Sequence, residues 1–139
     1  MKLSVAILIS GGGSNMEQLV KSMGPKHPAF PSIVISNKKE VPGLEKAQKL
    51  GVPTRVIDQN CIKNSGLDFE EEILKILNDY NVNIICLAGF MKILSKQFIE
   101  NYNDRILNIH PSLLPKYKGL NTHARVLASN DRIAGCSVH

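Results

Sequence analysis

An asparagine and a histidine two residues apart, Asn108 and His110, are the residues of this sequence best suited to chemistry. On an extended segment, side chains two positions apart project to the same side, and Pro111 and Pro115 stiffen the loop that follows. An amide can donate to a carbonyl oxygen as it gains negative charge, and an imidazole can give or take a proton near pH 7. The pair therefore predicts acyl transfer; the alternative is a histidine with a purely structural hydrogen bond.

A second candidate is the glycine loop, Ser10-Gly11-Gly12-Gly13-Ser14-Asn15, between an apolar run and a segment of helical period. Three glycines are expected to let the backbone adopt positive φ and bring its N–H groups close to an anion. The helix that follows adds the positive end of its dipole. We therefore predict that Gly12, Gly13, Ser14 and Asn15 bind a phosphate; the alternative is a plain turn in which Ser14 caps the helix.

The kind of phosphate is narrowed by motifs that the sequence lacks. A dinucleotide fingerprint GxGxxG would need glycine where Met16 stands, and the second predicted strand ends in Ser36-Asn37-Lys38-Lys39 without an acidic residue. The phosphate-loop motif GxxxxGK[ST] is also missing from the sequence. NAD and ATP are therefore disfavoured, a 2′-phosphorylated dinucleotide keeps only the support of the two lysines, and a phosphate monoester is favoured.

Covalent and metal chemistry find little support in the sequence. There is no GxSxG nucleophile motif, and Cys136 with His139 three residues later is more simply explained as a core thiol on a strand. The three cysteines are odd in number and form no CxxC, so neither a disulfide framework nor a zinc site is expected. A reducing, cytoplasmic setting fits this cysteine usage best.

The elements that must position these residues alternate between β-rich runs and segments of helical period. The predicted strands are Leu3–Ile9, Ser32–Ser36, Thr54–Ile57, Asn83–Ala88, Arg105–Ile109 and a last strand that begins at Ile133 and runs to Val138. The predicted helices are Ser14–Met23, Pro42 to just before Gly51, one capped by Asp68, one capped by Ser95, and Thr122–Ser129. This alternation predicts an open, doubly wound, mostly parallel α/β sheet covered by helices on both faces, with ligands at the carboxyl ends of the strands.

Length and composition limit the classes of protein to consider. A chain of 139 residues with 43% hydrophobic and 21% charged residues predicts one folded domain over residues 1–139 and argues against disorder. The longest near-apolar stretch, Ile84–Met91, is less than half of the roughly 20 residues that a membrane-spanning helix needs. The net charge of +5 is spread over scattered lysines and arginines, so phosphorylated or carboxylated small anions fit as well as nucleic acid.

Four segments together resemble the phosphoribosylglycinamide formyltransferase family, the folate-dependent formylating enzymes of purine biosynthesis. They are Ser10–Asn15, Leu87–Ser95 (LAGFMKILS), Asn108–Gly119 (NIHPSLLPKYKG) and Gly135–His139 (GCSVH). The segment from Asn108 to Pro115 is typical of the wider formyltransferase group, and the first two segments favour the glycinamide enzymes. Methionyl-tRNA formyltransferases differ in the first loop, and formyltetrahydrofolate deformylases differ around LAGFMKILS.

The resemblance implies a Rossmann-like formyltransferase fold and a role for each matching residue. Gly12, Gly13, Ser14 and Asn15 would bind the ribose 5-phosphate of glycinamide ribonucleotide, and Met91, Lys92, Ile93 and Leu94 would line the folate pocket. Asn108 would hold the formyl oxygen, His110 would donate the proton, and His139 would support them. The implied reaction is direct attack of the glycyl amine on the formyl carbon of 10-formyltetrahydrofolate, with no metal, no nucleic acid and no membrane involved; a homodimer stays open.

The sequence departs from this family in two places. An arginine that commonly helps to bind folate has Gly66 near its position, with Lys63 as the neighbouring cation. The family also follows the position of His139 with an aspartate in a DxG motif, whereas this sequence ends there. None of its five aspartates has a matching context: Asp58, Asp68, Asp79, Asp104 and Asp131. We therefore expect the domain to be truncated at its C-terminal end.

These residues leave three alternatives open. The first is a fragment that binds the ribonucleotide phosphate but is impaired in catalysis, because it lacks the general-base aspartate. The second is another folate-dependent formyltransferase or a deformylase. A dehydrogenase half-domain is the third, and the residues Met16 and Asn37 argue against it.

Overall fold

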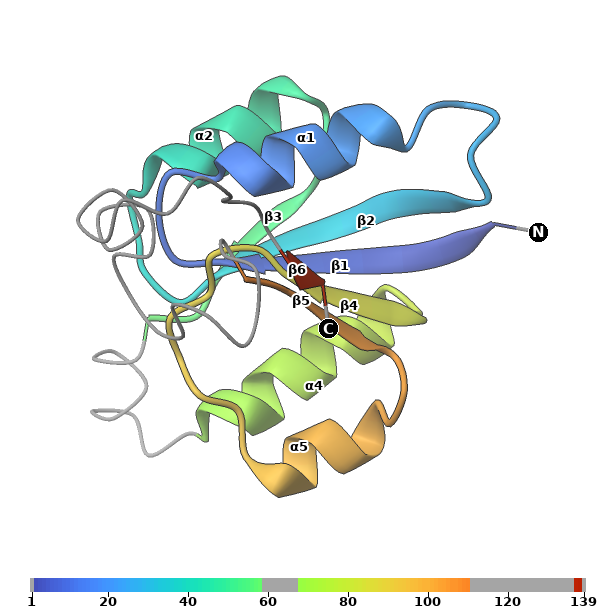
Figure 1. The fold of residues 1–139 in the computed structure, drawn as a ribbon. Helices are drawn as coiled ribbons and strands as arrows, with labels where there is room; N and C mark the ends of the chain where they lie inside the picture. The colour runs from blue at the N-terminus through green and yellow to red at the C-terminus, as the bar shows by residue number, and fades with distance from the viewer. Residues whose placement is uncertain (1, 59–67, 111–136, 139) are drawn as a thin grey trace, which may run out of the picture.

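The computed structural model describes residues 2–58, 68–110 and 137–138 (Figure 1). The predicted helix Thr122–Ser129, most of the last predicted strand, and the residues Lys63, Gly66, Cys61, Cys136 and His139 lie outside the described residues. The same holds for the loop from Pro111 to Pro115.

Strands and helices alternate along the described chain, as expected. The strands are β1 (Leu3–Ile9), β2 (Ala29–Ser36), β3 (Thr54–Val56), β4 (Ile84–Leu87), β5 (Ile106–His110) and β6 (Ser137–Val138). The helices are α1 (Ser14–Ser22), α2 (Pro42–Lys49), α4 (Phe69–Asp79) and α5 (Lys96–Asn101). The sheet order is β3-β2-β1-β4-β5-β6; β1 to β5 are parallel, and β6 pairs with β5 in the antiparallel sense. The expected doubly wound, mostly parallel sheet is confirmed.

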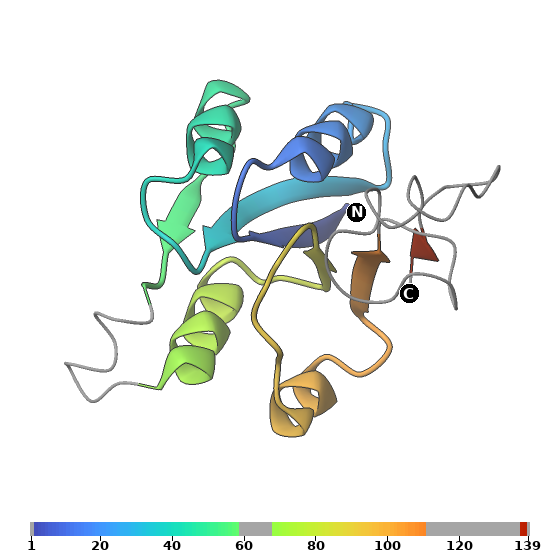
Figure 2. The ribbon, with the colours of Figure 1, turned by 60° about the vertical axis from the view of Figure 1, so that its left-hand side comes forward.

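Helices cover both faces of the sheet because β1 is apolar on both sides. Figures 1 and 2 show α1 and α2 on one face and α4 and α5 on the other. Ala6 and Leu8 of β1 share a core with the α4 and α5 helices, whereas Val5, Ile7 and Ile9 share a core with α1 and α2. This alternation follows the two-residue period of a strand. It gives the three-layer α/β/α arrangement that the apolar runs predicted.

The β2 strand begins three residues earlier than expected, at Ala29 instead of Ser32. Pro31 has no N–H to donate to a neighbouring strand, and such residues lie at strand edges or bulges. Here the register between β1 and β2 shifts at Val5, and the Ser32 hydroxyl donates to the Val5 carbonyl at 3.0 Å. The hydroxyl supplies the hydrogen bond that the proline cannot make, so the strand continues through it.

Both predicted N-caps are confirmed. The Asp68 carboxylate accepts from the N–H groups of Glu70 and Glu71, and the Ser95 hydroxyl accepts from Phe98 N at 3.2 Å. The alternative in which Ser14 caps α1 is wrong. Gly13 occupies the cap position with φ +75°, and no side chain caps the helix. In the part of the chain that the structure describes, no helix is long and apolar enough to cross a membrane.

Candidate functional site

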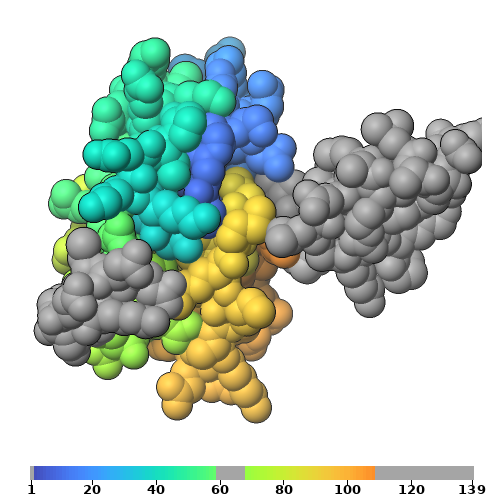
Figure 3. Space-filling view, turned by 90° about the vertical axis from the view of Figure 1, so that its left-hand side faces the viewer, coloured from blue at the N-terminus to red at the C-terminus, as the bar shows by residue number. Residues whose placement is uncertain are grey.

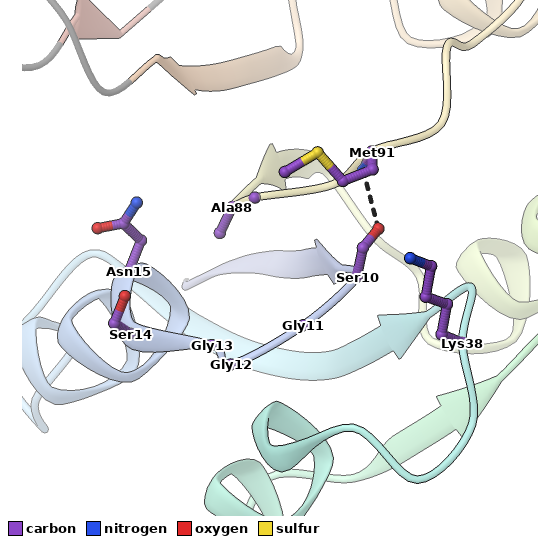
Figure 4. A pocket seen from close by; sticks show the side chains of 10 residues that line it. Ser10, Gly11, Gly12, Gly13, Ser14, Asn15, Lys38, Ala88 and Met91 are labelled. Atoms are coloured by element: carbon purple, nitrogen blue, oxygen red, sulfur yellow. Dashed lines mark hydrogen bonds between the residues drawn. The ribbon is translucent and has the colours of Figure 1, made fainter. Parts of the chain in front are cut away.

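The sheet order places a topological switch point at the carboxyl ends of β1 and β4. The chain leaves β1 toward β2 on one side, whereas β4 and β5 lie on the other. Ligands of doubly wound sheets bind where the strand order reverses in this way. A pocket of about 380 Å³ lies at this point (Figure 4), and its lining residues are Ser10, Gly11, Gly12, Gly13, Ser14, Asn15, Lys38, Ala88, Gly89 and Met91.

Two glycines from different segments make the glycine loop possible. Gly13 adopts φ +75°, and a Cβ there would lie 2.8 Å from Gly43 Cα. A Cβ on Gly43, in the first turn of α2, would lie 2.7 Å from the Gly11 carbonyl oxygen and 2.5 Å from Ile9 Cδ1. Gly43 N also donates to that carbonyl at 3.0 Å. The loop therefore packs directly on the backbone of α2.

The expected positive φ is found in the loop at Gly13. Of the glycines in the loop, Gly11 and Gly12 do not have positive φ, and a Cβ at either would meet no atom within 4 Å. The sharp change of direction needs only one left-handed residue, at the point where the loop enters α1. The two other glycines leave an open backbone surface facing the pocket (Figure 4).

The electrostatics of this loop favour an anion. The first N–H groups of a helix have no intrahelical partner, and at α1 the cap residue Gly13 has no side chain to bind them. The α1 helix is nine residues long, and its dipole adds positive potential at this end. Lys38 borders the same pocket. Glu17 in the first turn of α1 is an opposing charge, but Lys21 hydrogen-bonds it at 2.9 Å and lowers its pKa.

Ser10, Asn37 and Ser36 organise the strand ends around the pocket, and none of them was among the predicted site residues. Ser10 Oγ donates to Asn37 Oδ1 at 2.6 Å and accepts from Met91 N at 2.8 Å. Ser36 is fully buried; its hydroxyl donates to the Lys38 carbonyl and accepts from Lys38 N. A small polar residue at the end of an apolar strand was the available sequence signal, because a buried hydroxyl must find a partner.

The four residues expected to contact folate are divided between two pockets. Met91 lies beside the glycine loop, whereas Lys92, Ile93 and Leu94 line a second pocket of about 260 Å³ against the start of α4. The Lys92 ammonium lies 4.5 Å from the centre of the Phe69 ring. Met91 is 59% exposed and Ile93 is 94% exposed, so this segment presents aliphatic surface to solvent.

Asn108 and His110 lie on the next strand of the sheet. Asn108 pairs with Leu87 of β4 and is half-buried, and His110 is the last residue of β5. The carboxyl ends of β1, β4 and β5 therefore present the glycine loop, the segment with Met91 and the Asn–His pair in succession. Figure 3 faces this edge and shows the end of β1 between the residues after β2 and those after β4.

The structure thus brings Gly12, Gly13, Ser14, Asn15 and Met91 into one pocket. Gly43 was not identified from the sequence, although a glycine in the first turn of a helix is unfavourable and could have signalled a close contact. Cys86 in β4 is nearly buried, and burial raises the pKa of its thiol, so it stays protonated at neutral pH. Within the described ranges, no cluster of three histidine, cysteine or carboxylate side chains could hold a metal ion.

Comparison with known proteins gives a consistent result. The model of the family described as formyl transferase matches residues 3–139. The chain is 48% identical over 139 residues to the human trifunctional purine biosynthetic protein adenosine-3, covering 99% of this chain and 14% of that protein. It is 38% identical over 138 residues to the phosphoribosylglycinamide formyltransferase of Escherichia coli, covering 99% of this chain and 65% of that protein.

Solved structures agree with the sequence matches. The phosphoribosylglycinamide formyltransferase of Brucella melitensis superposes with a TM-score of 0.91 at 46% identity, over 100% of this chain and 72% of that one. The enzyme of the same name from Anaplasma phagocytophilum superposes with a TM-score of 0.86 at 42% identity, over 100% and 64%. The chain therefore spans about a seventh of the human trifunctional protein and about two thirds of the Escherichia coli enzyme.

Proposed function

The chain belongs to the formyl transferase family, and from this membership we propose that it transfers a formyl group from 10-formyltetrahydrofolate to the amine of glycinamide ribonucleotide. The relatives named phosphoribosylglycinamide formyltransferase support this choice of substrates. The reaction would be a step of purine biosynthesis. The observation that carries the proposal is the succession of three features along one edge of the sheet.

The first feature is the glycine loop, which we propose binds the ribose 5-phosphate. Open backbone at Gly11 and Gly12, the uncapped start of α1 and the Lys38 ammonium all favour an anion in the pocket. A phosphate monoester fits better than a dinucleotide, because Met16 is buried where a third glycine would have to stand. Gly12, Gly13, Ser14 and Asn15 are the proposed contacts.

The second feature is the segment Met91–Leu94, which we propose contacts the folate. Its exposed methionine and isoleucine side chains offer an apolar surface for an aromatic ring system. Met91 also lies in the pocket of the glycine loop, so the folate and the ribonucleotide would meet beside it. Lys92 would lie beside the folate at the second pocket.

The third feature is the Asn–His pair at the end of β5. Strands are about 4.8 Å apart, so β5 lies roughly 10 Å from β1, a gap that the ribose can bridge. The substrate amine would attack the formyl carbon, and the Asn108 amide would donate to the formyl oxygen as it becomes negative. The attacking nitrogen would give up its extra proton to water, the bond to the folate nitrogen would break, and His110 would supply the proton that this folate nitrogen takes up. His139 stays a proposed supporting residue.

The setting of this reaction is also part of the proposal. Neither a metal ion nor nucleic acid is needed for the chemistry, and we propose a cytoplasmic protein with two small substrates. A homodimer stays an open proposal. Whether the domain is complete for catalysis is decided by the activity measurement below.

The test is an assay of 10-formyltetrahydrofolate consumption with glycinamide ribonucleotide. The His110→Ala variant should lose at least about 100-fold in turnover, because a general acid of this kind typically contributes 10²–10⁴-fold. Ribonucleotide affinity, measured by calorimetry, should be retained. His27→Ala is the matched control, since His27 hydrogen-bonds Ala29 at the opposite edge of the sheet.

Each outcome separates the roles. Loss of both turnover and ribonucleotide affinity in His110→Ala would contradict the assigned role of the histidine. Binding of the ribonucleotide by the unmodified chain without any turnover would instead support a phosphate-binding fragment that does not catalyse the reaction.

A further inference from the structure

One hydroxyl group joins the ends of three neighbouring strands at the pocket. Ser10 follows β1, Asn37 follows β2 and Met91 follows β4. The side-chain oxygen of Asn37 and the backbone N–H of Met91 both hydrogen-bond to Ser10 Oγ. Asn37 N also donates to the Ile9 carbonyl at 3.4 Å. Figure 4 shows the bond between Ser10 and the backbone of Met91 at the side of the pocket near Lys38.

The direction of these bonds is fixed by the groups involved. A serine hydroxyl has one proton to donate and lone pairs to accept with. Because Ser10 donates its proton to Asn37 Oδ1, an oxygen lone pair is left to accept from Met91 N. Ser10 is only 5% exposed, so water competes poorly for either partner.

This bond holds Met91 in a segment without regular secondary structure. The β4 strand ends at Leu87, and the following residues up to Ser95 belong to no helix or strand. Gly89, two residues before Met91, adopts φ +73°, so the chain turns sharply there. Met91 is 59% exposed, so its own side chain is not locked in a core.

We propose that Ser10 is a positioning residue that fixes Met91 against the glycine loop and thereby sets the separation between the formyl donor and the ribonucleotide phosphate. The inference rests on the proposed function, because it assigns the donor to the segment of Met91 and the phosphate to the loop. Ser10 itself need not touch either substrate. Asn37 accepts the proton of this hydroxyl and so orients it toward Met91 N.

The chain offers a matched control on the same strand. Ser4 is also 5% exposed, and its one hydroxyl proton has two acceptors within reach, Ser32 Oγ at 2.7 Å and the Tyr80 carbonyl oxygen at 3.1 Å. It lies at the amino end of β1, away from the pocket. A general loss of stability should therefore follow from Ser4→Ala as well as from Ser10→Ala, whereas a change in site geometry should follow only from the second.

The first measurement does not depend on any ligand. In Ser10→Ala, the Met91 amide loses its acceptor, and its hydrogen exchange should speed up by about tenfold, the loss expected for one buried hydrogen bond. Ser4→Ala should leave the rate at Met91 within about twofold of wild type once global stability is taken into account. Equal rates at Met91 in wild type and Ser10→Ala would overturn the proposal.

The second measurement is kinetic. In Ser10→Ala, kcat/KM for the formyl donor should fall by about tenfold, while the dissociation constant of the ribonucleotide changes by less than about twofold. Asn37→Ala should lower kcat/KM for the formyl donor less than Ser10→Ala does, again with little change in ribonucleotide affinity. In the double variant, the fold-loss in kcat/KM should be smaller than the product of the two single losses. Ser4→Ala should not lower kcat/KM for the formyl donor selectively. Equal loss of affinity for both substrates in Ser10→Ala would overturn the proposal.

The two measurements separate the inference from the proposed function. If the unmodified chain consumes no formyl donor, the proposed function fails, and the exchange rate at Met91 still decides whether Ser10 holds that segment. If Ser10→Ala does not fold, Asn37→Ala carries both measurements, because Asn37 is half-buried and its loss removes only the partner of the hydroxyl.

Discussion

The two ends of β1 each carry a serine with the same burial, yet the two hydroxyls bind different kinds of partner. Ser4 and Ser10 are each 5% exposed and each hydrogen-bonded through the hydroxyl. At the amino end, Ser4 and Ser32 bond to each other and to the carbonyls of Val5 and Tyr80, beside the register shift between β1 and β2. At the carboxyl end, Ser10 bonds to two loops that line a pocket.

Burial and pocket size do not single out the carboxyl end, so the direction of the strands is what leads us to place the proposed site there. A larger pocket of about 590 Å³ lies at the amino end, lined by Ser22, Gly24, Pro25, Lys26, His27 and Pro28. The carboxyl end differs in that helix α1 begins there, with its positive dipole end and its unpaired N–H groups beside the loops. Parallel strands place every such loop on one edge.

The largest difference in stability and ribonucleotide affinity between the two ends should appear when a glycine at each end is replaced by alanine. Gly13→Ala must hold φ near +75° and place a Cβ 2.8 Å from Gly43 Cα, so it should lower the free energy of unfolding by about 2–4 kcal/mol. Ribonucleotide affinity should fall by at least about tenfold, as backbone N–H groups leave the phosphate. Chemical denaturation and calorimetry measure these effects.

Gly24→Ala is the control for this substitution at the amino end, and Gly12→Ala is the control within the loop. A Cβ at either position meets no atom within 4 Å. Both variants should therefore fold with wild-type stability. A Gly13→Ala protein that binds the ribonucleotide normally would show that the glycine loop is only a turn.

A smaller effect is expected from Gly43→Ala, which tests the contact between α2 and the loop. Alanine is the better helix former by about 1 kcal/mol, but its Cβ would lie 2.7 Å from the Gly11 carbonyl oxygen. We expect a net loss of about 1–3 kcal/mol in the free energy of unfolding, together with weaker phosphate binding. An increase in stability, with unchanged affinity, would show that the loop does not depend on α2.

The smallest effect should come from the lysine at each end. Lys38 borders the pocket, whereas the Lys2 ammonium donates to the Pro25 carbonyl at 2.7 Å. Lys38→Met should weaken ribonucleotide binding by about two- to fivefold at low salt, and added salt should reduce the difference, because the charge is exposed. Lys2→Met should leave binding unchanged. Calorimetry at two ionic strengths tests the pair.

Much of the fold could be predicted from the sequence, because the signals are local. The run Leu3–Ile9 gave both ends of β1 correctly, and Asp68 and Ser95 each cap the helix expected to follow them. Both are short-range effects of hydrophobic period and hydrogen-bonding side chains. The start of β2 was missed because Pro31 disfavours a strand unless a side chain from elsewhere replaces its missing N–H, and Ser32 does so.

Some predicted site residues share a pocket and others do not, because contacts between distant parts of the chain decide where each side chain lies. The glycine loop and Met91 do share a pocket, as parallel topology requires once the strand order is known. The other three expected folate contacts, Lys92, Ile93 and Leu94, line a second pocket beside α4. Two contacts hold their segment there: the Lys92 ammonium lies over the Phe69 ring, and Ser95 N donates to the Glu70 carboxylate. The roles of Asn108 and His110 remain proposals, tested by the assay above.

The sequence by itself determined the alternation of strands and helices, the apolar faces and the position of the glycine loop, since each depends on neighbours within a few residues. Only the tertiary structure decided that Gly43 must be a glycine and that Ser10 and Asn37 belong to the site. Gly43 lies 30 residues from Gly13, and Met91 lies 81 residues from Ser10. No local pattern records such contacts, because they exist only when the sheet brings the ends of separate strands to one edge.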